Sequence, residues 1–295
     1  RWVNFPSLSA GWIISNEKFW DVDFINFFKV RASWGQNGML SALGPDQFRA
    51  LITSSGIQYP KPGGGFYTGA EPELLANPEL TWATSEQIDV GIDMHMLANR
   101  LSLGIDYYQK TTKDLLTPGS PPPSVGNYAP FVNAGDVTNK GLELEIGYRK
   151  YEGKFNYDMN FNATWMDNEV TYLNPLLDRV AGAQVGTGWT ATWFELNQPV
   201  WYFRGYQTEG VFQNQGEIDA YKAANGGLAG YDPVAGDPIV SNTNGDNLIN
   251  EEDQTNIGNP HPKFMWGAMF NFAYSGFDLR VFLQCVHGQD VLLGW

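Results

Sequence analysis

Residues 87–108 have the sequence QIDVGIDMHMLANRLSLGIDYY, in which apolar and polar side chains alternate one by one. The alternation is interrupted at Ala98-Asn99-Arg100 and then resumes, which predicts two strands joined by a short turn. The same pattern returns at residues 141–148, GLELEIGY. Because successive side chains of a β-strand point to opposite faces, each of these segments has one apolar face and one polar face.

Similar alternation recurs along much of the chain. It predicts strands at residues 2–15, 26–35, 81–97, 100–116, 138–150, 155–172 and 263–274, with another strand beginning at residue 278. Short connections are predicted at residues 98–99, 151–154 and 275–276, and long connections at residues 36–80, 117–136 and 174–262, the last with a short helix at 217–224. Long strands with short turns at one end and long loops at the other are typical of an outer-membrane β-barrel.

The composition is consistent with a membrane barrel. Aromatic residues make up 15% of the 295 residues, as expected if aromatic girdles lie at two membrane interfaces. The net charge of −14, with no Lys/Arg cluster, argues against nucleic-acid binding. No apolar run approaches the ~18 residues of a membrane helix. The single cysteine, Cys285, excludes an intrachain disulfide.

Several short motifs resemble one known family. They are FPSLSAGW (5–12), FKVRASWG (28–35), NPELTWAT (77–84), DYY (106–108) with TKDLL (112–116), NKGLEL (139–144), GVFQNQ (210–215) and IGNP (257–260). Each motif is weakly specific, but together they run in family order over nearly the whole chain. In this combination the chain resembles the barrel of SusC/RagA-type TonB-dependent outer-membrane transporters.

The resemblance implies an all-β fold, namely part of a 22-stranded antiparallel transmembrane β-barrel with an internal plug and long extracellular loops. We expect residues 1–295 to form a single partial-barrel domain. The amino-terminal region, the plug and the last strands of such a transporter are expected to lie outside this sequence. The implied location is the outer membrane of a Gram-negative, Bacteroidota-type bacterium, with membrane lipid around the barrel.

The function implied by the resemblance is active import of oligomeric nutrients, either glycans or peptides. Its partners would be a SusD-like surface lipoprotein, the TonB–ExbB–ExbD complex and an oligosaccharide or peptide ligand, and two transporter–lipoprotein pairs would form a dimer. A hypothesis from another class is a secreted β-rich domain that binds or hydrolyses glycans. Solubility of the full-length protein without detergent would favour that alternative.

An enzyme is not expected. Six acidic residues share the polar register of the predicted strands: Asp89, Asp93, Asp106, Glu143, Glu145 and Asp158. Paired carboxylates can hydrolyse glycosidic bonds. Here, however, they are spread over successive strands, which favours a polar lining of an aqueous interior. The sequence also lacks a nucleophile-elbow motif and a zinc-like spacing of histidines.

Residues 242–253, NTNGDNLINEED, have the spacing of an EF-hand-like calcium loop. Ligand positions one, three, five, nine and twelve fall on Asn242, Asn244, Asp246, Asn250 and Asp253. Calcium is therefore the cofactor that this segment predicts. The alternative is an Asn/Asp-rich turn whose side chains bond to their own backbone.

Aromatic side chains in the long connections are candidates for contact with a ligand or with the lipoprotein. The principal candidates are Tyr128, Trp189, Trp193 and Trp201, and a second group comprises Tyr59, Phe66 and Tyr67. Aromatic rings stack on sugar rings and are enriched at protein interfaces. The alternatives are that these rings pack the loops against one another or anchor them at the membrane interface.

Overall fold

The computed structural model describes residues 3–39, 49, 52–54, 56–72, 75–119, 124, 130–175, 177–182, 184–186, 188–226 and 232–293. The chain divides into two compact units. The sheet unit comprises Arg1–Asp178 and Trp266–Cys285, and the loop unit comprises Arg179–Met265 and Val286–Trp295.

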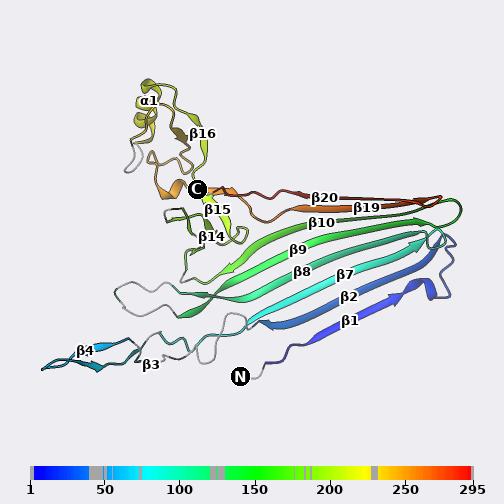
Figure 1. The fold of residues 1–295 in the computed structure, drawn as a ribbon, viewed down its shortest axis with the longest axis horizontal. Helices are drawn as coiled ribbons and strands as arrows, with labels where there is room; N and C mark the ends of the chain where they lie inside the picture. Colours follow the sequence, from blue (N-terminus) through cyan, green and yellow to red (C-terminus); the bar gives the residue numbers. More distant parts are fainter. Residues whose placement is uncertain are drawn as a thin grey trace. The chain divides into compact units, whose positions relative to one another are not determined.

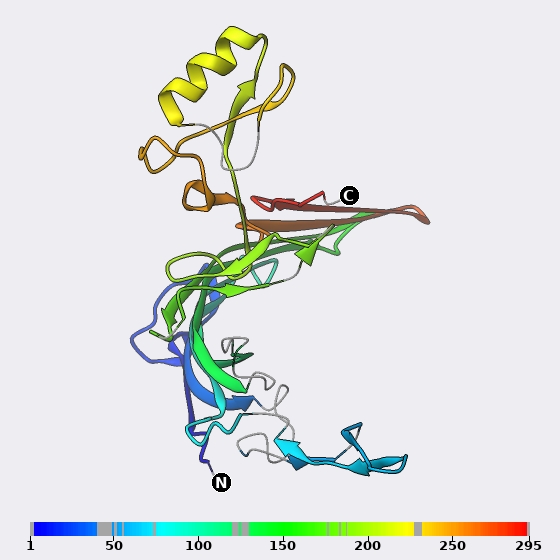
Figure 2. The same cartoon turned by 90° about the vertical axis from the view of Figure 1, so that its left-hand side faces the viewer.

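The sheet unit is built on an eight-stranded sheet in the order β1-β2-β7-β8-β9-β10-β19-β20 (Figure 1). Its strands are β1 (Ser7–Ile13), β2 (Ile25–Met39), β7 (Ala83–Met96), β8 (Leu101–Pro118), β9 (Phe131–Lys150), β10 (Phe155–Leu173), β19 (Phe264–Tyr274) and β20 (Phe277–His287). Neighbouring strands from β1 to β10 pair antiparallel. The predicted all-β fold is confirmed, and the sheet is an open, curved one (Figure 2).

The register places side chains of one kind in rows across the strands. Val30, Ile92, Ile105, Leu144 and Ala163 are successive partners on β2, β7, β8, β9 and β10. Because the side-chain period of a strand is two, this register puts every alternating apolar set on the same face. We call this the outer face, and the opposite, polar face the inner face.

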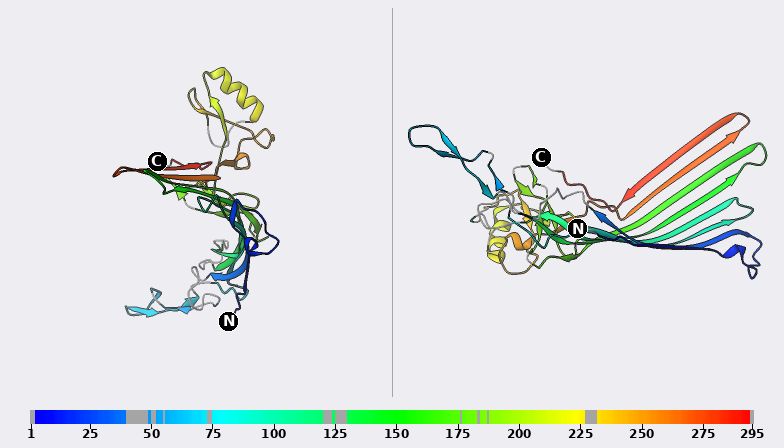
Figure 3. Two further views of the ribbon diagram at one scale, coloured as in Figure 1. Left: turned by 90° about the vertical axis from the view of Figure 1, so that its right-hand side faces the viewer. Right: turned by 90° about the horizontal axis from the view of Figure 1, so that it is seen from below.

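Tight turns join the strands at one end of the sheet (Figure 3). Between β7 and β8, Leu97, Ala98 and Asn99 all have left-handed backbone conformations, with φ of 55°, 57° and 61°. The Asn99 backbone N–H donates to the Asn26 side chain at 3.1 Å, which supports this unusual turn. Ser275 and Gly276 connect β19 to β20 with φ of 50° and 86°, the combination of a two-residue hairpin turn.

Strand β9 begins earlier than the sequence predicts, at Phe131 instead of residue 138. Residues 131–137, FVNAGDV, do not alternate regularly, so their pattern did not indicate a strand. They pair nevertheless with the end of β8 and with β10, across register shifts. Five apolar residues of the strands at this end of the sheet are buried: Ala83, Ala134, Val137, Val170 and Leu173.

The connection between β2 and β7 contains four short strands: β3 (Ile52–Thr53), β4 (Gln58–Pro60), β5 (Phe66–Thr68) and β6 (Glu71–Pro72). Strand β3 pairs with β6 and β4 pairs with β5, which gives an extended antiparallel segment that we call the hairpin arm. This local pairing was not predicted, because the segment is rich in Pro and Gly. Four of its large apolar side chains are exposed, namely Ile52, Tyr59, Phe66 and Tyr67.

The loop unit contains short strands and a helix. One sheet has the order β11 (Val180–Ala181), β14 (Thr192–Phe194), β15 (Tyr202–Gly205) and β18 (Thr255–Gly258), and two further pairs join β12 (Gln184–Val185) to β13 (Trp189–Thr190) and β16 (Thr208–Val211) to β17 (Pro238–Val240). The predicted helix is confirmed as α1 (Gln215–Asn225). No helix in the described part of the chain is long and apolar enough to cross a membrane.

Local chemistry explains the position of α1. The Asn214 side chain accepts a hydrogen bond from the Glu217 backbone N–H, so it caps the first turn. Gly226 follows the last turn with φ of 65°, a conformation that favours glycine at a helix end. Ile218 from the helix is buried, as are Phe212 and Ile249 elsewhere in the loop unit.

Candidate functional surfaces of the sheet and its loops

The outer face presents apolar side chains that the described residues do not cover. Ile88 and Val90 on β7 and Tyr107 on β8 are each 44% exposed. Leu101, Leu144 and Phe161, which would be buried in a two-layer sandwich, are only half-buried. A row of apolar groups in this state needs an apolar environment, because monomeric soluble proteins rarely expose large apolar patches.

Aromatic rings gather on the outer face near the short turns. Tyr148 of β9 stacks on Tyr157 of β10 with ring centroids 5.8 Å apart, and Phe155 of β10 stacks on Phe272 of β19 at 6.0 Å. Such a band of aromatic side chains is expected where a barrel crosses a membrane interface.

Toward the long loops the outer face changes from apolar to polar between two successive outer-face positions of β7, Ile88 and Glu86. Trp34 lies opposite Ile88, and its indole N–H donates to Glu86 at 2.8 Å. The ammonium group of Lys113 lies 2.6 Å from a Glu86 carboxylate oxygen, and that of Lys140 lies 3.3 Å from Asp167. The outer face thus has an apolar belt bounded by aromatic groups at one edge and by paired charges at the other.

The inner face carries a group of charges centred on Arg31 of β2. Its guanidinium group contacts three carboxylates, with N–O distances of 2.6 Å to Asp106, 3.1 Å to Asp93 and 3.4 Å to Asp89. The predicted acidic residues of β7 and β8 are therefore brought together. One positive charge among three negative ones leaves this part of the inner face acidic.

Sequence reasoning missed the central role of Arg31. Its register partner is Gly91, and a methyl group on Gly91 would lie 2.8 Å from the Arg31 guanidinium carbon and 2.0 Å from an Asp106 carboxylate oxygen. A glycine inside a strand often indicates close approach of another group. That signal was present in the sequence, but it did not identify the approaching group.

The three predicted loop tryptophans lie in the loop unit. Trp193 on β14 lies close to two cations, with the guanidinium carbons of Arg179 and Arg204 5.4 Å and 5.8 Å from its ring centroid. Trp201 packs against Phe194 at 5.8 Å, and Trp189 on β13 is 43% exposed. Trp193 thus has structural partners, whereas Trp189 offers the most open ring of the three.

Tyr128, the fourth candidate, lies outside the described residues. The hairpin arm supplies three other aromatic side chains, and Tyr59, Phe66 and Tyr67 are 56%, 66% and 53% exposed. Tyr59 and Tyr67 are register partners, and the Lys61 ammonium group lies 5.3 Å from the Tyr67 ring centroid. These rings form an aromatic surface available to a partner.

Residues 242–253 adopt a compact loop in which side-chain oxygens accept backbone N–H groups. Asn242 accepts from Gly245 at 2.6 Å, and Asp246 accepts from Leu248 at 2.8 Å. The carboxylate of Asp253 is fully buried and accepts from Thr243 and Asn250, each at 2.9 Å.

Two further positions of this loop match the predicted pattern. Asn247, at the position usually held by glycine in a calcium loop, has φ of 60°. Asn244 and Asn250 likewise accept backbone N–H groups. Among the described residues, no group of three or more His, Cys, Asp or Glu side chains is arranged to hold a metal ion. The five predicted ligands supply amide and carboxylate oxygens, which suit calcium, and the calcium site stays a prediction.

Comparison with known protein families identifies the family of this chain. The family model described as "TonB dependent receptor-like, beta-barrel" matches residues 1–248. The chain belongs to this family. The family of receptors suggested by the sequence motifs is therefore confirmed, and so is the expectation that this chain is not an enzyme.

Relatives come from two bacteria. The chain is 30% identical to TonB-dependent receptor P39 of Formosa agariphila over 98% of its own length and 30% of that receptor. It is 33% identical to the TonB-dependent receptor SusC of Bacteroides thetaiotaomicron over 59% of its own length and 18% of SusC.

Among solved structures, the chain is similar to that of the RagAB peptide transporter, with a TM-score of 0.72 and 20% identity. The similarity covers 96% of this chain and 29% of the other, and at this identity it shows the fold alone. The chain spans less than a third of the length of these relatives.

Proposed function

We propose that this chain forms part of the barrel wall of an active outer-membrane importer. The importer would be energised by a TonB–ExbB–ExbD complex and would take up oligomeric nutrients, either glycans or peptides. The observation that carries this proposal is the opposite chemistry of the two faces of one sheet, in a chain of the TonB-dependent receptor family.

Each face has a distinct role in this proposal. The outer apolar belt would contact hydrocarbon, because a closed barrel satisfies its backbone between strands and can present apolar side chains to lipid. The inner face would line an aqueous interior that holds the plug and admits hydrated ligands. Strands β8, β9 and β10 have 18, 20 and 19 residues, well beyond the ~9–11 needed to span a bilayer, so they would extend past the membrane.

The loops would dock a SusD-like surface lipoprotein. The hairpin arm supports this assignment with its exposed rings at Tyr59, Phe66 and Tyr67, and the loop unit adds Trp189. Exposed aromatic side chains are favourable contacts for a protein partner and for sugar rings. The proposal includes assembly of two transporter–lipoprotein pairs into a dimer.

The proposal includes two candidate classes of substrate, peptides and glycans. RagAB, which shares this fold, is a peptide transporter, and peptides are therefore one candidate for this chain. Glycans are the other, because the exposed rings also suit sugars. Neighbouring genes would separate the two, since glycosidases beside this gene would indicate glycans and peptidases would indicate peptides.

The decisive experiment locates the complete receptor and measures uptake. We expect it in the outer-membrane fraction, with a band that shifts on boiling, and we expect deletion of its gene to abolish growth on one class of oligomer. Replacing Tyr59, Phe66 and Tyr67 together by serine should reduce co-purification of the lipoprotein while the band shift is kept. A receptor that is soluble without detergent would refute the proposal and favour a secreted glycan-binding or glycan-hydrolysing protein.

A further inference from the structure

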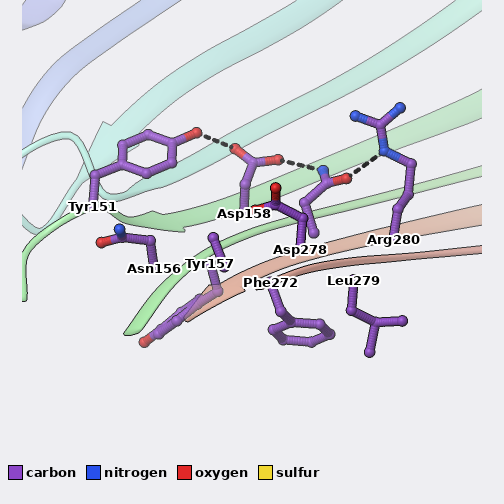
Figure 4. A pocket seen from close by; sticks show the side chains of 10 residues that line it. Tyr151, Asn156, Tyr157, Asp158, Phe272, Asp278, Leu279 and Arg280 are labelled. Atoms are coloured by element: carbon purple, nitrogen blue, oxygen red, sulfur yellow. Dashed lines mark hydrogen bonds between the residues drawn. The ribbon is translucent and has the colours of Figure 1, made fainter. Parts of the chain in front are cut away.

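A hollow of about 680 Å³ lies at the short-turn end of the sheet unit, between β10, β19 and β20 (Figure 4). Its polar lining consists of the turn residue Tyr151 and the inner-face residues Asn156, Asp158, Asn271, Asp278 and Arg280. The apolar side chains of Tyr157, Phe272 and Leu279 also line it and point away from the polar group (Figure 4). In an outer-membrane barrel the short turns lie on the periplasmic side. An imported ligand would therefore meet this hollow late in its passage.

A hydrogen bond to Asn271 orients the exposed Arg280 side chain. Its Nε donates to the Asn271 side-chain oxygen at 2.7 Å, and the Asn271 amide nitrogen lies 3.5 Å from an Asp158 carboxylate oxygen. The other Asp158 oxygen accepts from the Tyr151 hydroxyl at 3.0 Å. Figure 4 shows this chain of bonds with the two terminal guanidinium nitrogens beyond it.

Those terminal nitrogens have no hydrogen-bond acceptor among the described residues. A guanidinium group that is oriented through Nε keeps four N–H donors on its terminal nitrogens, in a planar arrangement that matches a carboxylate. Because Asn271 already orients the group through Nε, a ligand would lose less entropy in ordering it than with a free arginine side chain.

The rest of the lining limits the charge of the ligand. Asp158 and Asp278 share the hollow with Arg280. A dianion such as phosphate would be repelled by these two carboxylates, whereas a monoanion would be opposed less strongly. The Asn156 side-chain oxygen is buried and has no hydrogen-bond partner in the described part of the chain. A buried acceptor in this state favours a ligand that also donates an N–H or O–H group.

We propose that this hollow is a subsite for the carboxylate of an imported oligomer, with Arg280 as the carboxylate-binding residue and Asn271 as its positioning residue. This proposal rests on the import function proposed above. The carboxylate could belong to a peptide or to a uronic-acid oligosaccharide, since both also carry donors for Asn156.

The test measures ligand affinity for the complete receptor, purified in detergent with its lipoprotein. The probes are a short peptide with a free carboxyl terminus against its amide, and a galacturonate oligomer against its methyl ester. Arg280→Gln should weaken binding of the free acid by about tenfold and leave the capped form unchanged. The control Lys154→Gln removes the same charge from a nearby exposed turn that does not line the hollow, and should change neither affinity.

The pair of probes that responds to Arg280→Gln identifies the source of the carboxylate. If Arg280→Gln does not assemble, Asn271→Ala keeps the positive charge and should still weaken the free acid selectively. Equal losses for free and capped probes, or a change below twofold, would overturn the subsite. If neither free acid binds the wild-type receptor, the subsite is likewise overturned. Uptake of neutral oligomers by cells then decides separately whether the import function stands.

Discussion

A single arginine placed at different depths on the outer face of β7 tests whether the apolar belt contacts lipid. Ile92 lies in the middle of the belt, four residues from Ile88 at one edge and four from Met96 at the other. At ~3.4 Å per residue, four residues correspond to ~14 Å along the strand. With a typical tilt of ~40°, Ile92 would lie ~10 Å from each edge.

This depth sets the expected cost of the substitution. An arginine side chain cannot readily bring its charge to water from mid-belt, so Ile92→Arg should lower the free energy of unfolding by about 2–4 kcal/mol. Ile88 pairs with Trp34, whose indole already bonds to Glu86. Arginine at Ile88 would reach this polar edge, and Ile88→Arg should cost only about 0–1 kcal/mol.

The assay is urea unfolding of the complete receptor in lipid vesicles, followed by the shift of the unboiled band in gels. Asn160→Arg serves as the inner-face control, because its side chain is exposed beside Asp158 and should change stability little. Equal costs at Ile88 and Ile92 would refute this reasoning, and so would a neutral Ile92→Arg. Either result would mean that depth in a membrane does not determine how much an arginine on this face destabilises the protein.

Three other predictions concern charges and buried polar groups. Arg31→Met leaves Asp89, Asp93 and Asp106 without their shared cation and should cost about 1–2 kcal/mol in the same unfolding assay, with Arg31→Lys costing less. Burial and the hydrogen bond to Glu195 raise the pKa of Tyr202, so the folded protein keeps this proton above pH ~10 while the unfolded chain ionises. Stability should therefore decrease as the pH rises above ~10, and Tyr202→Phe should reduce that decrease. Calcium should raise the melting temperature of the receptor if residues 242–253 bind it, an effect that Asp246→Asn should abolish. No rise in the wild type would contradict the calcium prediction.

Much of the sheet could be predicted because alternation is a local property. Each strand carries its own two faces, so the outer position of Ile92 and the inner position of Asp93 follow from their order alone. The short turns could also be predicted from neighbouring residues alone, since Ser275-Gly276 has the residue types of a two-residue hairpin turn. The start of β9 could not be predicted from local sequence. Residues 131–137 become a strand because β8 and β10 lie beside them and supply backbone partners.

The ion pairs of the inner face could not be predicted from the sequence for a different reason. Arg31 and Asp106 are 75 residues apart, and their contact depends on the register of three strands at once. Alternation predicts only that both side chains are on the inner face. A shift of one strand by two residues would preserve every face and still separate this pair, so the pattern of polarity cannot identify the ion pair.

Gly91 supplies information that polarity lacks. It lies opposite Arg31 on β2 and opposite Asp106 on β8, so its missing side chain leaves the space in which the two charged groups meet. A strand-interior glycine weakens a sheet, and its presence between two alternating segments indicates that something larger occupies the position. The same reasoning applies to Gly147, where a methyl group would lie 2.5 Å from the Ser102 hydroxyl. Such glycines indicate where groups approach on the inner face, and only the register indicates which groups they are.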